Sequence, residues 1–149
     1  MQQLETLKLK GELQVVLTGS DGIVRETHDF KNLVVSTGLN FIVSRMKDTS
    51  ATAMSHMELG TGSTAAAAGD TTLGTAISGS RSALTSTTVS TNTITYVASF
   101  AAGTGTGAVT EAGIFNASSA GTILARTCFP VVNKQSGDSM TVSWVITVS

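Results

Sequence analysis

Charged residues are scarce in this chain, and its middle has almost none. Acidic and basic residues make up 13% of the 149 positions, whereas soluble domains usually carry about a quarter. Between positions 58 and 130 the polar positions are filled by Ser, Thr, Asn and Gly, and the only charged residues are Glu58, Asp70, Arg81, Glu111 and Arg126. Such a composition is typical of a β-rich surface that neighbouring molecules cover. It is less typical of a free-standing enzyme.

The chain also lacks a long apolar run and a basic cluster. Hydrophobic residues reach 41%, but none of their runs approaches the roughly 20 residues that cross a bilayer. The net charge is −1, and the nine Lys and Arg residues are scattered, whereas phosphate binding needs them gathered on one face. We therefore expect no membrane and no nucleic acid among the partners, and association with protein subunits instead.

Cysteine and metal-binding patterns are equally sparse. The single cysteine, Cys128, excludes a disulfide within one chain, and its apolar neighbours predict a buried, inert thiol. His28 and His56 have no second ligand at metal-site spacing, which predicts no metal and no cofactor. Copies of one His meeting on a symmetry axis remain an alternative.

Catalytic motifs fail the test of context. The glycine-rich segment 60–65 has no crossover helix after it, and segment 103–107 lacks the lysine of a phosphate-binding loop, so both predict turns. No Ser lies in a nucleophile elbow. The carboxylates outside the N-terminal third are not paired in sequence, which favours structural roles for Glu58, Asp70, Glu111 and Asp138. The sequence predicts that the protein is not an enzyme.

Length and charge distribution predict one domain, residues 1–149, with two parts. Residues 1–48 form a charged N-terminal hairpin and helix, and residues 49–149 form a sparsely charged, β-rich body. The first residues include neither a basic leader nor an apolar segment, so we expect no signal peptide and synthesis in a cytoplasm.

One helix is predicted near residues 36–47. Ser36 can cap it, and Arg45 and Lys47 suit its last turn, where the helix dipole favours cations. The apolar spacing i, i+3, i+4, i+7 predicts that one face packs on the core, formed by Leu39, Ile42, Val43 and Met46.

Elsewhere the periodicity is that of strands. Residues 140–148 alternate most clearly and place Trp144 on the apolar face, where we expect it beside Ile114, Phe115 and Ile123. Further strands are predicted at 7–17, 23–28, 54–59, 81–89, 93–100, 109–115 and 122–129. Together these patterns predict a mainly β fold, an antiparallel β-sandwich or jelly-roll-like domain with one short helix.

Three residues of the neutral region have predicted structural roles. Asp70 is expected to accept hydrogen bonds from the turn that follows it, above a buried Leu73. Arg81 and Arg126 are expected to pair with a carboxylate or with carbonyls at a subunit contact, because an unpaired buried guanidinium is costly.

Two segments together resemble small structural proteins of tailed bacteriophages. The first is Glu-Leu-Gly-Thr-Gly-Ser-Thr-Ala at 58–65 running into Gly-Asp-Thr-Thr-Leu-Gly at 69–74. The second is Glu-Ala-Gly-Ile-Phe-Asn-Ala at 111–117 running into Leu-Ala-Arg and Phe-Pro at 124–130. The resemblance covers about residues 55–149, and Ala76 departs from it where related sequences often carry an acidic residue.

The resemblance implies a virion location and a capsid cement or decoration protein. Its partner would be the major capsid protein, and it would form a homo-oligomer, with a trimer favoured. The alternatives are a tail, baseplate or fibre component and, from another class, a carbohydrate-binding module. The candidate interface residues are the basic side chains Lys8, Lys10, Arg25, Lys31, Arg81 and Arg126.

Overall fold

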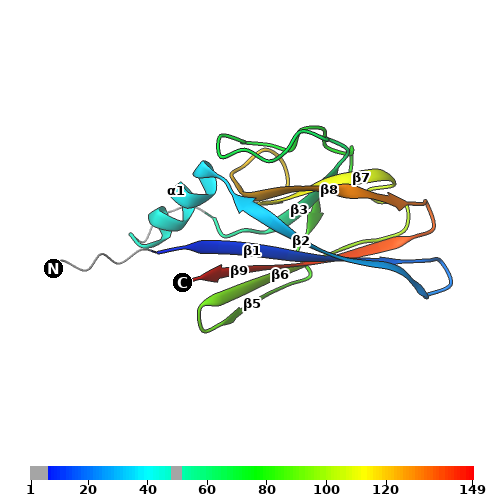
Figure 1. Cartoon of the computed structure of the whole chain (residues 1–149), viewed down its shortest axis with the longest axis horizontal. Helices are drawn as coiled ribbons and strands as arrows, with labels where there is room; N and C mark the ends of the chain where they lie inside the picture. Colours follow the sequence, from blue (N-terminus) through cyan, green and yellow to red (C-terminus); the bar gives the residue numbers. More distant parts are fainter. Residues whose placement is uncertain (1–6, 48–51) are drawn as a thin grey trace.

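The computed structural model describes residues 7–47 and 52–149 and confirms the predicted fold class. That part of the chain contains nine strands and one short helix (Figure 1). In chain order they are β1 (Leu9–Thr18), β2 (Val24–Val34), α1 (Ser36–Arg45), β3 (His56–Gly60), β4 (Ser82–Ala83), β5 (Ser86–Ser90), β6 (Thr93–Phe100), β7 (Gly107–Phe115), β8 (Ile123–Lys134) and β9 (Ser139–Val148).

The strands form one antiparallel sheet in the order β4-β3-β7-β8-β2-β1-β9-β6-β5. The sheet curls so that β3, β7 and β8 lie over the layer formed by β1, β9, β6 and β5 (Figure 1). Strand β2 belongs to both layers, because most of its length pairs with β1 while Leu33 and Val34 pair with β8. The main core fills the space between the layers.

Strand β9 shows how the apolar alternation builds this core. Its even-numbered residues Met140, Val142, Trp144 and Ile146 are buried, while the residues between them face outward and are half-buried. Because successive side chains of a strand point to opposite faces, this pattern gives β9 one core face and one outer face. Strand β1, paired along the whole of β9, repeats the pattern with Leu13, Val15 and Leu17 buried.

The predicted surroundings of Trp144 are only partly right. Trp144 is fully buried and shares the main core with Ile114. Phe115 and Ile123 belong to a second cluster, with Val35 and Leu73. The prediction placed the neighbouring residues Ile114 and Phe115 on one side of a strand, but consecutive side chains of a strand diverge.

Helix α1 is present, but its predicted packing face is right only at Ile42. Exposed fractions are 43% for Leu39, 64% for Val43 and 84% for Met46. Ile42 packs on the core as predicted, and so does Phe41, which was not part of the predicted face. The helix is turned this way because Gly38 faces β8, where an added Cβ would collide with the carbonyl oxygen of Leu124. Val35, whose backbone is extended, is the N-cap in place of Ser36, and the helix ends at Arg45.

Strand boundaries differ at β2, which was predicted to end at 28 but continues to Val34, and around Pro130. Strand β8 was predicted to end at 129 but continues to Lys134. The register with β7 shifts between the pairs Glu111–Cys128 and Val109–Val132, so Pro130 lies in an irregular stretch of the ladder. A bulge tolerates proline because the missing N–H is not needed there. The predicted strand 81–89 is divided into β4 and β5.

Candidate functional site

The connection from β3 to β4, residues 61–81, contains no strand and lies above β7 and β8 (Figure 1). Beneath it are two ionised side chains, Glu111 on β7 and Arg126 on β8. Gly113 is the register partner of Arg126, so Glu111 and Arg126 are diagonal neighbours on one face of the two strands. Nη2 of Arg126 is 2.6 Å from Oε2 of Glu111, and Nε is 3.3 Å from the same oxygen.

Both side chains also hold the loop. Arg126 donates to the Asp70 carboxylate at 2.7 Å and to the carbonyl oxygen of Thr64 at 2.9 Å. Glu111 accepts from the backbone N–H groups of Gly74 at 3.0 Å and Thr75 at 2.7 Å. The pair therefore fixes the loop at both ends of the segment 64–75.

Asp70 acts within this loop in a different way from the one predicted. Its carboxylate accepts a hydrogen bond from the backbone N–H of Ala67, which precedes it, and not from the turn that follows. Its second partner is Arg126. The predicted burial of Leu73 is confirmed, since this side chain is 6% exposed in the second cluster.

The electrostatics keep the cluster ionised. Burial is the largest single influence on Glu111 and opposes its charge, but the hydrogen bonds from Arg126, Thr75 and Gly74 together lower its pKa below the ordinary 4.5. The pKa of Asp70 is lowered by the Ala67 N–H and by Arg126. Burial disfavours the charge of Arg126, yet its two carboxylate partners raise its pKa. An anion–cation–anion group of this kind needs its partners, because a lone buried charge is costly.

Three glycines make room for the Glu111 carboxylate. A Cβ at Gly60 or Gly62 would come within 2.8 Å of its atoms, and a Cβ at Gly74 would lie 3.2 Å from Oε2. The glycines of the segment 60–74 are therefore needed by packing as well as by turns. These closely spaced glycines are the feature of the sequence that indicates a buried side chain beneath the loop, whereas their sequence context predicted them only as turn residues.

The cluster has little capacity for chemistry. Glu111 is 0% and Arg126 2% exposed, and both carboxylate oxygens of Glu111 accept hydrogen bonds from within the chain. Cys128 is half-buried, not buried as predicted, and its thiol donates to the Thr64 carbonyl oxygen at 2.9 Å. Burial raises the pKa of this thiol, which disfavours the reactive thiolate. The arrangement is suited to holding a loop in place.

Arg81 forms a second internal pair. Its Nε is 3.1 Å from the Glu58 carboxylate, and both side chains are 14% exposed. Its guanidinium carbon lies 3.6 Å from the centre of the Phe115 ring, and Nη1 donates to the carbonyl oxygen of Ala117 at 2.9 Å. Such a stacked cation adds to the packing of the ring.

The six candidate interface residues are thus not one surface. Arg126 and Arg81 were expected to pair with a carboxylate or with carbonyls at a subunit contact. The pairing with a carboxylate is confirmed, within the same chain, and the two side chains are 2% and 14% exposed. Their role at a subunit contact stays a prediction. The remaining four are exposed and belong to the β1–β2 region: Lys8, Lys10, Arg25 and Lys31.

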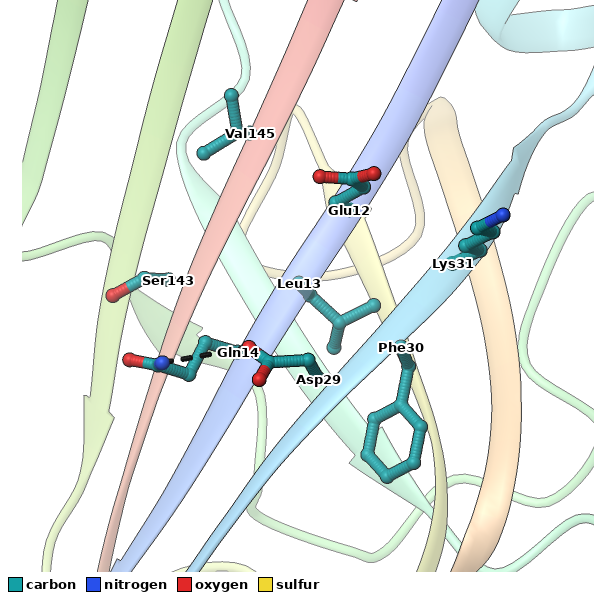
Figure 2. Close-up of a pocket in the computed structure, with 8 residues that line it drawn as sticks. All are labelled: Glu12, Leu13, Gln14, Asp29, Phe30, Lys31, Ser143 and Val145. Carbon is teal, nitrogen blue, oxygen red and sulfur yellow. Dashed lines mark hydrogen bonds between the residues drawn. The ribbon is translucent and has the colours of Figure 1, made fainter.

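Part of this charged surface is hollowed. An open depression of about 470 Å³ lies across β2, β1 and β9 (Figure 2). Glu12 stands opposite Lys31 and Gln14 opposite Asp29 in the β1–β2 register. The Gln14 amide donates to Asp29 at 3.4 Å, whereas Arg25 pairs with Asp21 at 2.9 Å in the hairpin. The depression therefore carries charges of both signs.

Aromatic and metal-ligating side chains are not gathered on the surface. All seven aromatic residues lie in the described ranges, and each is buried or half-buried there. Phe30, which lines the depression, is stacked on Phe129 at 4.7 Å and on His28 at 5.7 Å. Within residues 7–47 and 52–149, no group of three His, Cys, Asp or Glu could hold a metal ion, and no helix is long and apolar enough to cross a bilayer.

Comparison of the chain with protein-family models, with curated proteins and with solved structures gave no match. The resemblance to structural proteins of tailed phages therefore rests on the sequence motifs of residues 55–149 alone.

Proposed function

We propose that the chain is a structural protein of a phage virion, a capsid cement protein that binds across neighbouring subunits of the major capsid protein and stabilises the shell. It acts by covering surface and catalyses no reaction. It works as a homo-oligomer, with a trimer as first choice, on the outer surface of the capsid. The sequence motifs support the virion assignment, and one feature of the fold supports the mode of action.

That feature is the distribution of charge over the sheet. The adjacent strands β9, β6 and β5 contain no Asp, Glu, Lys, Arg or His. Their outward-facing positions are Thr, Ser and Val, and no described helix packs there, since α1 contacts mainly β8. Next to this neutral surface, β1 and β2 expose Lys10, Glu12, Asp29 and Lys31. A neutral area beside a charged one suits a contact that neighbouring subunits cover.

Each part would contribute differently to binding. The neutral area can be buried without desolvating a charge, which avoids the largest penalty of association. The charges of β1 and β2 would set orientation, since complementary charges give specificity and association rate more than affinity. An ordinary interface buries on the order of 1,600 Å². Many copies on one shell multiply a modest affinity for each copy.

The two alternatives differ in their support. A tail, baseplate or fibre component would use the same surfaces with another partner, and particle location distinguishes it. A carbohydrate-binding module would need aromatic rings on which sugars stack. Trp144 and Tyr96 are buried, at 0% and 6% exposure. Phe30, which lines the depression, is half-buried and already stacked on Phe129 and His28, so no exposed aromatic platform favours that reading.

The test uses phage shells that lack the protein. Purified protein should bind them and raise their rupture temperature, because a ligand that binds only the intact shell stabilises it, by about 2.7 kcal/mol per site at a hundredfold excess over Kd. The double variant Lys10→Glu/Lys31→Glu should bind less tightly. The control is Lys47→Glu, which makes the same change of charge at a site that follows helix α1. It should bind normally. Absence of binding to shells together with presence on tails would transfer the assignment to the tail alternative.

A further inference from the structure

Strand β5 is an open edge of the sheet. Among the described strands its one neighbour is β6, and all five of its residues are exposed. In an antiparallel ladder about half of the backbone N–H and C=O groups of an edge strand point away from its only neighbour and stay unpaired. Another β-strand satisfies these groups, as in recognition by strand addition.

The edge has none of the usual protection against such pairing. Natural edge strands are shielded by charges, proline, bulges or extreme shortness. The sequence of β5, Ser-Thr-Thr-Val-Ser, contains neither a charge nor a proline, and it pairs with β6 without a break from Ser86 to Ser90. The opposite edge, β4, is only two residues long and follows directly after Arg81, which is engaged with Glu58.

We propose that β5 is an interface between copies of this chain, and that it pairs antiparallel with β5 of a second copy around a two-fold axis. The strand is complementary to itself in that register. Thr88 lies on the axis opposite its equivalent, Thr87 stands opposite Val89 of the second copy, and Ser86 stands opposite Ser90. Like charges directly opposite each other on the two paired strands would be destabilising. Neither β5 nor β6 contains a charged residue.

The inference commits to a second copy because the strand offers a foreign peptide nothing to recognise. A heterologous strand is selected by charges or by side-chain pockets beside the edge, and β5 presents only small hydroxyls and Val89, which is 71% exposed. Self-pairing gives Val89 a β-branched neighbour, Thr87, at each end of the contact. Cross-strand pairs of this kind stabilise a sheet.

A contact of five residues is short, about 17 Å long. Alone it falls below the area of an ordinary stable interface, so the pairing is expected to be weak in dilute solution and effective where copies are concentrated. It closes at two copies and is therefore distinct from the three-fold association proposed above. In the presence of trimers it would join neighbouring trimers.

Disulfide trapping tests the pairing. In a Cys128→Ser background, Thr88→Cys should give a disulfide-linked dimer under mild oxidation, read on a denaturing, non-reducing gel. The control is Thr95→Cys, because Thr95 is the partner of Thr88 on β6 and lies one strand further from the edge. It should give at least tenfold less dimer. The gel reports the β5 contact whether or not trimers form, so its result is separate from that of the shell-binding test.

A second variant checks that trapping reflects the paired strands. Val89→Lys places like charges near the axis, so adding it to the Thr88→Cys protein should reduce the dimer at least fivefold. Val131→Lys, on β8 and 49% exposed, is its matched control and should leave the dimer unchanged. Circular dichroism confirms that each variant is folded. The proposal would be overturned if the folded Thr88→Cys protein stayed monomeric over a 100-fold range of protein concentration. It would also be overturned if Thr95→Cys gave as much disulfide-linked dimer as Thr88→Cys.

Discussion

Glu111 and Arg126 face each other at 2.6 Å beneath a loop of the same chain, with 0% and 2% of their side chains exposed. The loop supplies further partners through Thr64, Asp70, Gly74 and Thr75. An ion pair in such a place holds a long strand connection against the sheet. The first two predictions concern what happens when this pair loses one member or a proton.

Glu111→Gln should lower the free energy of unfolding by about 3–5 kcal/mol, because it leaves a buried guanidinium with less compensating charge. Urea denaturation followed by Trp144 fluorescence measures the change. Glu12→Gln, which removes an exposed carboxylate that pairs with Lys10, is the control and should leave stability unchanged. A loss below 1 kcal/mol for Glu111→Gln would show that the pair does not fix the loop.

Acid should destabilise the native protein through the same cluster. The folded pKa values of Glu111 and Asp70 lie below their ordinary values of 4.5 and 3.8. A depressed folded pKa contributes stability that is complete above the unfolded pKa and is lost as pH falls through the folded value. Unfolding free energy should therefore be level near pH 6 and decline below about pH 4–5. Glu111→Gln should flatten this decline, and an unchanged slope in the variant would contradict the assignment.

Trp144→Ala should cost about 3–5 kcal/mol, since it removes a fully buried indole from the main core. Thermal or chemical unfolding measures it, with far-ultraviolet circular dichroism to confirm that the variant folds. Trp144→Phe, which keeps an aromatic ring, should cost less. Equal costs for the two variants would mean that ring packing does not determine the effect.

Gly38→Ala should destabilise the protein, by about 1–3 kcal/mol. Alanine raises helix propensity by about 1 kcal/mol at an exposed site, but here its Cβ would collide with the Leu124 carbonyl oxygen and push α1 from β8. Asn40→Ala, at an exposed position of α1, gives the propensity effect alone and should stabilise slightly. Equal stabilisation by both substitutions would show that α1 does not need the close approach.

Periodicity located the strands but not all of their ends, and it was insufficient for the helix face. The alternation of 140–148 identified β9, because a strand between two others in one layer must bury every second side chain. For α1 the apolar spacing was right at Ile42 and wrong at Leu39, Val43 and Met46, because backbone approach at Gly38 determined the rotation. The spacing of hydrophobic residues does not reveal where a neighbouring backbone comes so close that only glycine fits.

The buried cluster could not be assembled from sequence spacing because its members are far apart along the chain. Glu111 and Arg126 come together only through the β7–β8 register, which a bulge near Pro130 shifts. The sequence predicts a carboxylate as one possible partner for Arg126 and a structural role for Glu111, but it does not connect the two residues. The glycines at 60, 62 and 74 leave room for the Glu111 carboxylate, and they are the sequence feature that indicates a buried charged group near the loop.

The pairing of β1 with β9 has a consequence for how the chain acquires its structure. Leu9 is the partner of Val148, and the ladder continues to Thr18 opposite Ser139. The layer therefore cannot close until the last described strand has been synthesised, and until then β1 has an unpaired edge. Contacts between distant segments slow folding and prolong exposure to aggregation. Slow closure is the expected behaviour, with yield in the cell sensitive to temperature.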